Sequence, residues 1–342
     1  MSIFDQKVIK YEMKPLSSLE KVFPDETPVY RMECQMLSGL WGETVSFQVA
    51  YTGDFVMRER LDVRVVSELA EHVHVRTVEM VPVGRATNGI VDDNYLKTTS
   101  GLYPDLLKDL KDGKVIVYSR QWRSLWVDVD ITNEIPAGEY EIELQLIKEG
   151  EVVCSAKQKV TVIGTELPKL DIMHTEWMHA DCLADYYHVE VFSEEHWKLL
   201  ENYFQEYVKR DCNMMLTPLF TSPLDTAIGL ERTTCQLIDV EVKDGEYVFG
   251  FEKLKRWIDL CKKCGIEYFE MSHLFSQWGA KYAPKVVATV NGKKEKIFGW
   301  HTPAVGEYTK FLESFLPQLT AKLRKWEIAD VTYFHISDEP RE

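Results

Sequence analysis

The sequence lacks a surplus of basic residues, and this absence narrows the range of partners. Its 342 residues carry 40 Lys and Arg against 55 Asp and Glu, which gives a formal net charge of -15. Nucleic acids and anionic membrane surfaces repel an acidic protein. We therefore expect neither as a partner, whereas the charge leaves a neutral substrate open.

Long apolar runs are also absent. The opening residues, MSIFDQKVIKYEMK, contain no basic segment followed by an apolar one, as a secretory signal requires. No apolar stretch approaches the roughly 20 residues of a membrane-spanning helix. These absences favour a cytoplasmic protein without a membrane partner.

Cysteine is sparse and follows no recognisable scheme. The seven cysteines are scattered, and Cys261 and Cys264 form a single CxxC pair just before Gly265. No second pair stands at zinc spacing, and the pair falls at the end of a helical pattern. Two packed helix residues explain it better than a redox or zinc site. We expect free thiols in a reducing cytosol and no cofactor.

The first half of the chain alternates apolar and polar residues with a period of two. The stretches are TVSFQVAY (44–51), LDVRVVSE (61–68), VHVRTVEMVPV (73–83), SLWVDVDI (124–131), GEYEIELQLI (138–147) and QKVTVI (158–163). This period gives a strand one buried and one solvated face, as in an antiparallel sandwich. A length of about 100–200 residues per domain allows two domains here. We predict an N-terminal antiparallel β-sandwich over residues 1–165.

Residues 166–342 alternate strand-like with helix-like segments. The strand candidates are 169–177, 213–220, 266–275 and 331–337, and the helix candidates follow Ser193 or cover 251–264 and about 305–326. Ser193 suits an N-cap, Gly265 suits a helix end, and Pro317 predicts a kink or a break. Such alternation implies parallel strands with right-handed crossovers. Because a closed barrel of this class needs eight strands, we predict an incomplete (β/α)8 TIM-type barrel with about four.

Polar and aromatic residues collect where these strands end. The candidates are His174, Glu176 and Trp177 after the first strand, His273, Gln277 and Trp278 after the third, His335, Asp338 and Glu339 after the fourth, and Trp300 in a loop. Barrel enzymes place their catalysis at strand carboxyl ends. Aromatic faces cover the apolar face of a sugar ring, while carboxylates, amides and histidines bind its hydroxyls. Paired carboxylates beside aromatics indicate glycoside chemistry.

Two of these stretches have a second interpretation. In a chain with 55 acidic residues, the pair Asp338 and Glu339 could also be solvated surface. The two are adjacent, so both converge on one ligand only if the strand has ended or bulged, and Pro340 favours this. The stretch HTEWMHAD (174–181) mixes metal-ligand types. Its spacing matches no metal motif, so we predict a sugar subsite there and no metal.

Four blocks of the second half resemble glycoside hydrolase family 123, which is spread through many bacterial genomes. The blocks are HADCLADYYHVEVFSEEHW, NMMLTPLFTSPLDTA, YFEMSHLFSQWGAKYAP and TYFHISDEP, and they follow one another from about residue 170 to the end. With the β-rich first half, the resemblance covers nearly the whole chain. It implies an exo-acting N-acetyl-β-galactosaminidase with a retaining, substrate-assisted mechanism. The substrate is then an oligosaccharide or glycoconjugate that ends in an N-acetylhexosamine.

The resemblance also assigns roles to the acidic pair. The family's two acids fall on Asp338, which would orient the 2-acetamido group, and on Glu339, which would act as general acid and then as base. The family continues for several βα units beyond this motif. We therefore expect a fragment of impaired activity, whose last strand is an open edge and a site for homo-oligomer formation.

Two other functions stay open at the level of sequence. A non-catalytic carbohydrate-binding protein would keep the aromatic residues without the chemistry. A barrel enzyme of another class, such as a metal-dependent lyase or isomerase, would use the histidines.

Overall fold

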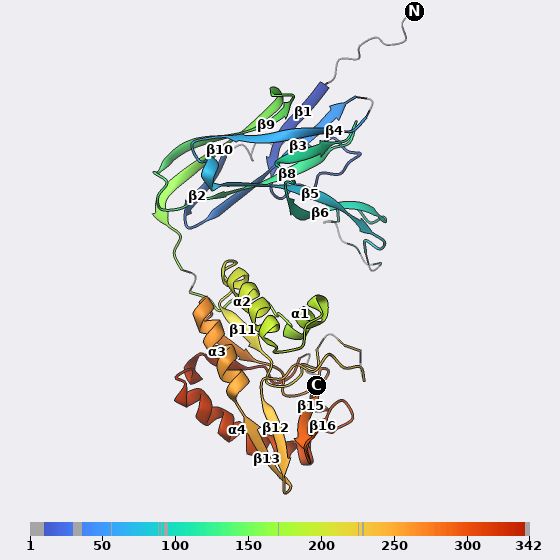
Figure 1. Ribbon diagram of the computed structural model, residues 1–342, viewed down its shortest axis with the longest axis vertical. Coiled ribbons are helices and arrows are strands. Elements are labelled where there is room, and N and C mark those ends of the chain that lie inside the picture. The colour runs from blue at the N-terminus through green and yellow to red at the C-terminus, as the bar shows by residue number, and fades with distance from the viewer. Residues whose placement is uncertain are drawn as a thin grey trace, which may run out of the picture. The chain divides into compact units, whose positions relative to one another are not determined.

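The computed structural model describes residues 10–29, 36–55, 57–87, 89, 91, 95–169, 171–224, 226–227 and 229–338. The chain divides into two compact units, Met1–Lys169 and Leu170–Glu342. Strands dominate the first unit, and helices alternate with strands in the second (Figure 1). Within the described ranges, none of the helices is long and apolar enough to cross a membrane.

The first unit consists of two five-stranded sheets. One contains, in spatial order, β1 (Lys10–Ser17), β3 (Thr44–Asp54), β8 (Arg123–Asp130), β5 (Val73–Val83) and β6 (Gly101–Asp109). The other contains β2 (Met36–Trp41), β10 (Glu151–Glu166), β9 (Gly138–Lys148), β4 (Glu59–Val66) and β7 (Lys114–Val117). Neighbouring strands are antiparallel, except that β2 pairs with β10 in parallel. A 3-10 turn, η2 (Ala70–His72), precedes β5.

The two sheets enclose one hydrophobic core. Alternate residues of β8 and β9 are buried in it: Leu125, Val127 and Val129 from the one, Ile142, Leu144 and Leu146 from the other. Full burial of such a side chain contributes roughly 1.5–3 kcal/mol to stability. The alternation in the sequence reflects this core, and the six predicted strands are confirmed as β3, β4, β5, β8, β9 and the second half of β10.

The second unit is built on three parallel strands in chain order. These are β11 (Met214–Thr217), β14 (Tyr268–Met271) and β17 (Thr332–Phe334), the last preceded by a 3-10 turn, η3 (Ala329–Val331). The helices are α1 (Ala180–Tyr187), α2 (Glu194–Val208), α3 (Glu252–Cys264) and α4 (Glu307–Lys325). Helix α2 lies beside α3 (Figure 1), and Arg256 of α3 binds Glu194 of α2 at 2.6 Å.

The predicted helix signals act as expected at two of three positions. The Ser193 hydroxyl accepts a hydrogen bond from the His196 amide at 3.3 Å and caps α2. Gly265 ends α3 with φ of 101°, a left-handed conformation that costs glycine little. Helix α4 continues through Pro317, so the predicted break is absent, while the alternative of a kink stays a prediction. Helix α1 was not predicted from the sequence.

The predicted strand at 169–177 is wrong. Residues 171–179 contain no strand, although the segment lies against the start of β11. The Asn213 and Met214 amides both donate to the His174 carbonyl at 3.0 Å, while the Asn213 side chain binds the His174 amide and the Ile172 carbonyl at 2.8 Å. The Asn213 side chain thus takes the place of the backbone hydrogen bonds of a regular strand pair. Among the described residues, this parallel sheet has three strands rather than four.

The long connections after β11 and β14 fold into a second sheet. It contains β13 (Glu246–Gly250), β12 (Asp239–Lys243), β15 (Val286–Val290) and β16 (Lys293–Phe298) in that order. Phe249 and Phe298 of this sheet pack against Phe311 of α4, with ring centroids 5.4 and 5.1 Å from it. These connections are therefore part of the core of the second unit.

Candidate active site

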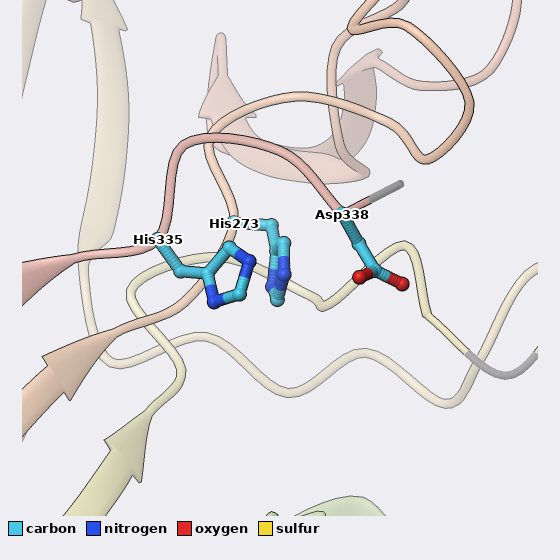
Figure 2. A group of neighbouring side chains, drawn as sticks. All are labelled: His273, His335 and Asp338. Carbon is cyan, nitrogen blue, oxygen red and sulfur yellow. The ribbon is translucent and has the colours of Figure 1, made fainter. Parts of the chain in front are cut away.

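The candidate site lies at the carboxyl ends of the parallel strands. His273 follows β14, and His335 and Asp338 follow β17. Because the strands are parallel, these ends meet at one edge of the sheet. Figure 2 shows the three side chains in a row, with His273 in the middle. Each offers a ligand atom within 4.8 Å of the others.

The two histidine rings lie in contact at a tilt and differ in their surroundings. Their centroids are 3.9 Å apart, with 34° between the ring planes. His273 is 1% exposed, and neither of its ring nitrogens has a hydrogen-bond partner among the described residues. Burial, with a contribution from His335, lowers the pKa of His273 to about 4. His273 is therefore neutral near pH 7 and has one donor and one acceptor nitrogen available for a ligand.

Trp177 completes a cluster of three rings. Its ring stands edge-on to His273 and to His335, with centroid distances of 5.2 and 5.3 Å. The indole remains 39% exposed, so part of it is available to a ligand. The structure thus brings together three residues that the sequence placed at three different strand ends.

Asp338 is held by the loop that follows β14. The Gln277 side chain donates to Asp338 Oδ2 at 2.9 Å, and the Trp278 amide donates to the Asp338 carbonyl at 3.2 Å. The Ser337 hydroxyl also donates to the Ser276 carbonyl at 3.1 Å. These bonds join the two loops and fix the position of the carboxylate.

The same loop contains strained backbone. Trp278 and Ala280 have φ of 58° and 53°, in the left-handed region that residues with a side chain avoid. Each such residue costs of order 1–3 kcal/mol, and such strain gathers at functional sites. Trp278 lies beside Trp300, with ring centroids 6.5 Å apart, and Tyr282 lies 6.4 Å from Trp300. An aromatic surface therefore adjoins the loop that holds Asp338.

Two predicted site residues lie elsewhere. His174 Nδ1 is 3.2 Å from the Asp211 carbonyl, near the amino end of β11, and its Nε2 is 3.5 Å from the exposed Glu176 carboxylate. The side chains of His174 and Glu176 thus pair with each other and with Asp211 rather than with the ring cluster. Glu339 lies outside the described residues.

Glu270 is a residue of the site that the sequence analysis missed. It lies in β14, is 7% exposed, and accepts hydrogen bonds from His335 Nδ1 at 2.8 Å and from Trp177 Nε1 at 3.0 Å. A charged residue inside the buried run YFEM was the available signal, since a carboxylate is rarely buried without partners.

His273, His335 and Asp338 are also the residues that could hold a metal ion. Two imidazoles that share one zinc ion keep their ring centres about 5 Å apart, given Zn–N distances near 2.1 Å. The observed distance of 3.9 Å between the ring centroids is shorter, so the rings would have to separate. In the stretch 174–181, Asp181 is occupied by Arg232, which it binds at 2.8 Å.

A carboxylate, a buried neutral histidine and aromatic rings near strand carboxyl ends suit a carbohydrate ligand. Residues 177–342 match the model of the glycoside hydrolase 123 catalytic domain, so this segment of the chain belongs to that family. The resemblance stated from the sequence is thereby confirmed.

Solved structures support the same fold. A family 123 glycoside hydrolase from Clostridium perfringens, studied for glycolipid glycan hydrolysis, is 14% identical with a TM-score of 0.70 over 95% of this chain. The match covers 58% of that structure's own length. A β-glucosidase from Listeria innocua matches 47% of this chain and 17% of its own at 10% identity, and its TM-score of 0.22 carries no weight. No curated protein matches the sequence.

Proposed function

We propose that the chain carries the acidic pair of an exo-acting N-acetyl-β-galactosaminidase that works by retaining, substrate-assisted catalysis. Asp338 orients the 2-acetamido group, whose oxygen attacks the anomeric carbon, and stabilises the positive charge that develops. Glu339 protonates the leaving oxygen and then takes a proton from the water that opens the intermediate. The substrate is an oligosaccharide or glycoconjugate with a terminal N-acetylhexosamine.

One observation carries this proposal: Asp338 stands beside a buried neutral histidine at the carboxyl ends of parallel strands, within the segment that matches a glycosidase catalytic domain. A neutral His273 suits a neutral sugar, because its two unpartnered nitrogens can bind hydroxyl groups without a counter-ion. Trp177, Trp278 and Trp300 supply aromatic surface for the apolar face of sugar rings.

We propose that the chain has the two domains that the alternation patterns predicted. The two sheets of the first unit form a β-sandwich, and the second unit forms the first part of a (β/α)8 barrel. Strand β17 is an edge of its sheet within the described residues, and it exposes Tyr333 by 41% and Phe334 by 38%. The chain spans 58% of the length of the Clostridium structure that it matches.

The mechanism is tested with 4-nitrophenyl N-acetyl-β-galactosaminide as substrate. We expect the first product to keep its β-configuration in the proton spectrum and N-acetylgalactosamine thiazoline to inhibit competitively, because its ring mimics the cyclic intermediate. A product of inverted configuration, or a rate unaffected by the thiazoline, contradicts substrate assistance.

A carbohydrate-binding role is the second candidate, and the partly exposed Trp177 beside His273 favours it. An aromatic face and imidazole nitrogens can bind a sugar without any acid or base step. Binding of N-acetylgalactosamine without turnover of the aryl glycoside supports this second role.

A further inference from the structure

The Glu270 carboxylate binds two of the three rings in the cluster of Trp177, His273 and His335. It accepts from His335 at Oε1 and from Trp177 at Oε2, at 2.8 and 3.0 Å, and Thr175 Oγ1 lies 3.5 Å from Oε2. The donors come from separate parts of the chain, one after β17 and the other in the segment before α1. With Glu270 only 7% exposed, water competes little for these bonds.

Both oxygens of Glu270 are therefore in use. An ionised carboxylate only accepts hydrogen bonds, so the proton of the contact with His335 resides on Nδ1. The second ring nitrogen, Nε2, is then left to other partners. A carboxylate that fixes one nitrogen of a histidine also fixes the tautomer and the orientation of the ring.

We propose that Glu270 is a positioning residue that clamps Trp177 and His335 together and fixes the tautomer of His335 for sugar binding. This inference rests on the proposed function for its ligand, an N-acetylated sugar. Glu270 itself touches no reacting atom. It acts by orienting the indole of Trp177 and the Nε2 atom of His335 toward the ligand. Its loss should therefore weaken sugar binding more than it slows the chemical step.

Glutamine is a sharp probe of this clamp because it has nearly the shape of glutamate and only one acceptor oxygen. In Glu270→Gln, the NH2 group faces one of the two partners: Trp177, which can only donate, then loses its bond, or His335 changes to the Nε2–H tautomer and accepts at Nδ1. The variant keeps the volume of the side chain, so its fold is expected to persist. Trp177→Phe is the second probe, since it removes one donor and leaves the contact between Glu270 and His335 intact.

The matched control is Glu295→Gln in β16. It makes the same chemical change at an exposed position of the second sheet and is expected to leave binding and tautomer unchanged.

The experiment measures two independent quantities on the full chain. Nitrogen-15 correlation spectra of labelled protein report the tautomer of His335, and N-acetylgalactosamine thiazoline titrations report affinity. We expect the Nδ1–H form in the parent, a mixture of tautomers in Glu270→Gln, and an affinity loss of about fivefold or more, as for one ordinary lost hydrogen bond. Trp177→Phe is expected to keep the Nδ1–H form and lose affinity.

The outcomes separate this inference from the proposed function. An unchanged tautomer together with unchanged affinity in Glu270→Gln overturns the clamp. If Glu270→Gln fails to fold, an Nε2–H form in the parent or in Trp177→Phe overturns it instead. If the parent does not bind the thiazoline at all, the proposed function fails, and the tautomer spectra still decide whether Glu270 fixes His335.

Discussion

Gln277 Nε2 donates a hydrogen bond to Asp338 Oδ2 at 2.9 Å, and this bond links the loop after β14 to the carboxylate after β17. The Trp278 amide of the same loop also donates a hydrogen bond, at 3.2 Å, to the Asp338 carbonyl. The position of Asp338 therefore depends on a neighbouring loop as well as on its own strand.

The first prediction concerns this bond. Gln277→Ala frees one oxygen of Asp338, and a hydrogen bond to a charged group contributes about 1.5–3 kcal/mol. We expect kcat/KM for the aryl glycoside to fall by about tenfold or more, with little change in the unfolding temperature. Gln318→Ala on the exposed face of α4 is the control. Equal activity of the two variants would show that the bond does not position Asp338.

The second prediction concerns the pH dependence of stability. The pKa of His273 in the folded state is about 4, lowered by burial, while an unperturbed histidine has a pKa near 6.5. Between these values the unfolded state binds more protons, so acid destabilises the fold. The stabilisation is fully present above about pH 6.5 and is lost as the pH falls toward 4.

His273→Gln removes this proton linkage. We expect the free energy of unfolding of the parent to drop by about 1–3 kcal/mol more than that of the variant between pH 7.5 and pH 4.5. Denaturant titrations at the two values measure it. His196 is also buried with a lowered pKa and remains in both proteins, so the difference isolates His273. Parallel curves for parent and variant would contradict a neutral buried His273.

The third prediction concerns a buried ion pair. Arg232 binds Asp181 at 2.8 Å, and both side chains are less than a tenth exposed. Removing one partner leaves an uncompensated buried charge, so Asp181→Ala is expected to cost about 3–5 kcal/mol of unfolding free energy. Lys310→Ala, which breaks an exposed pair with Glu307, should cost under about 1 kcal/mol. A small cost for Asp181→Ala would show that the site relaxes or admits water.

The fourth prediction concerns metal ions. The ring centres of His273 and His335 lie closer together than those of two histidines that share one metal ion. We therefore expect hydrolysis to be unaffected by EDTA. A rate lost on chelation and restored by zinc or manganese would instead support a metal-dependent enzyme that uses His273, His335 and Asp338.

Strand and helix signals predicted much of the fold because they are local. A short stretch of sequence is enough to predict the alternation in β8 and β9, the N-cap at Ser193 and the helix end at Gly265. The hairpins β12–β13 and β15–β16 also carried a local signal that the sequence analysis did not use. Their turns are Asp244-Gly245 and Asn291-Gly292, all four residues with positive φ, as two-residue hairpins favour.

The site was less predictable because contacts between distant segments assemble it. His273, His335, Trp177 and Asp338 were identified from their places at strand ends, whereas His174 and Glu176 shared that apparent place and lie elsewhere. The false strand at 169–177 caused this error, since Asn213 substitutes for its ladder. Glu270 was missed because its two partners lie 93 and 65 residues away in the sequence.

The most direct test of the central claim is hydrolysis of 4-nitrophenyl N-acetyl-β-galactosaminide by the full chain and by Asp338→Asn and Glu339→Gln. Acid or base catalysis by one side chain contributes about 10²–10⁴-fold, so each variant should lose at least about a hundredfold in kcat while still binding the thiazoline. Measurable turnover by the parent that survives both substitutions would contradict the assignment of the acidic pair.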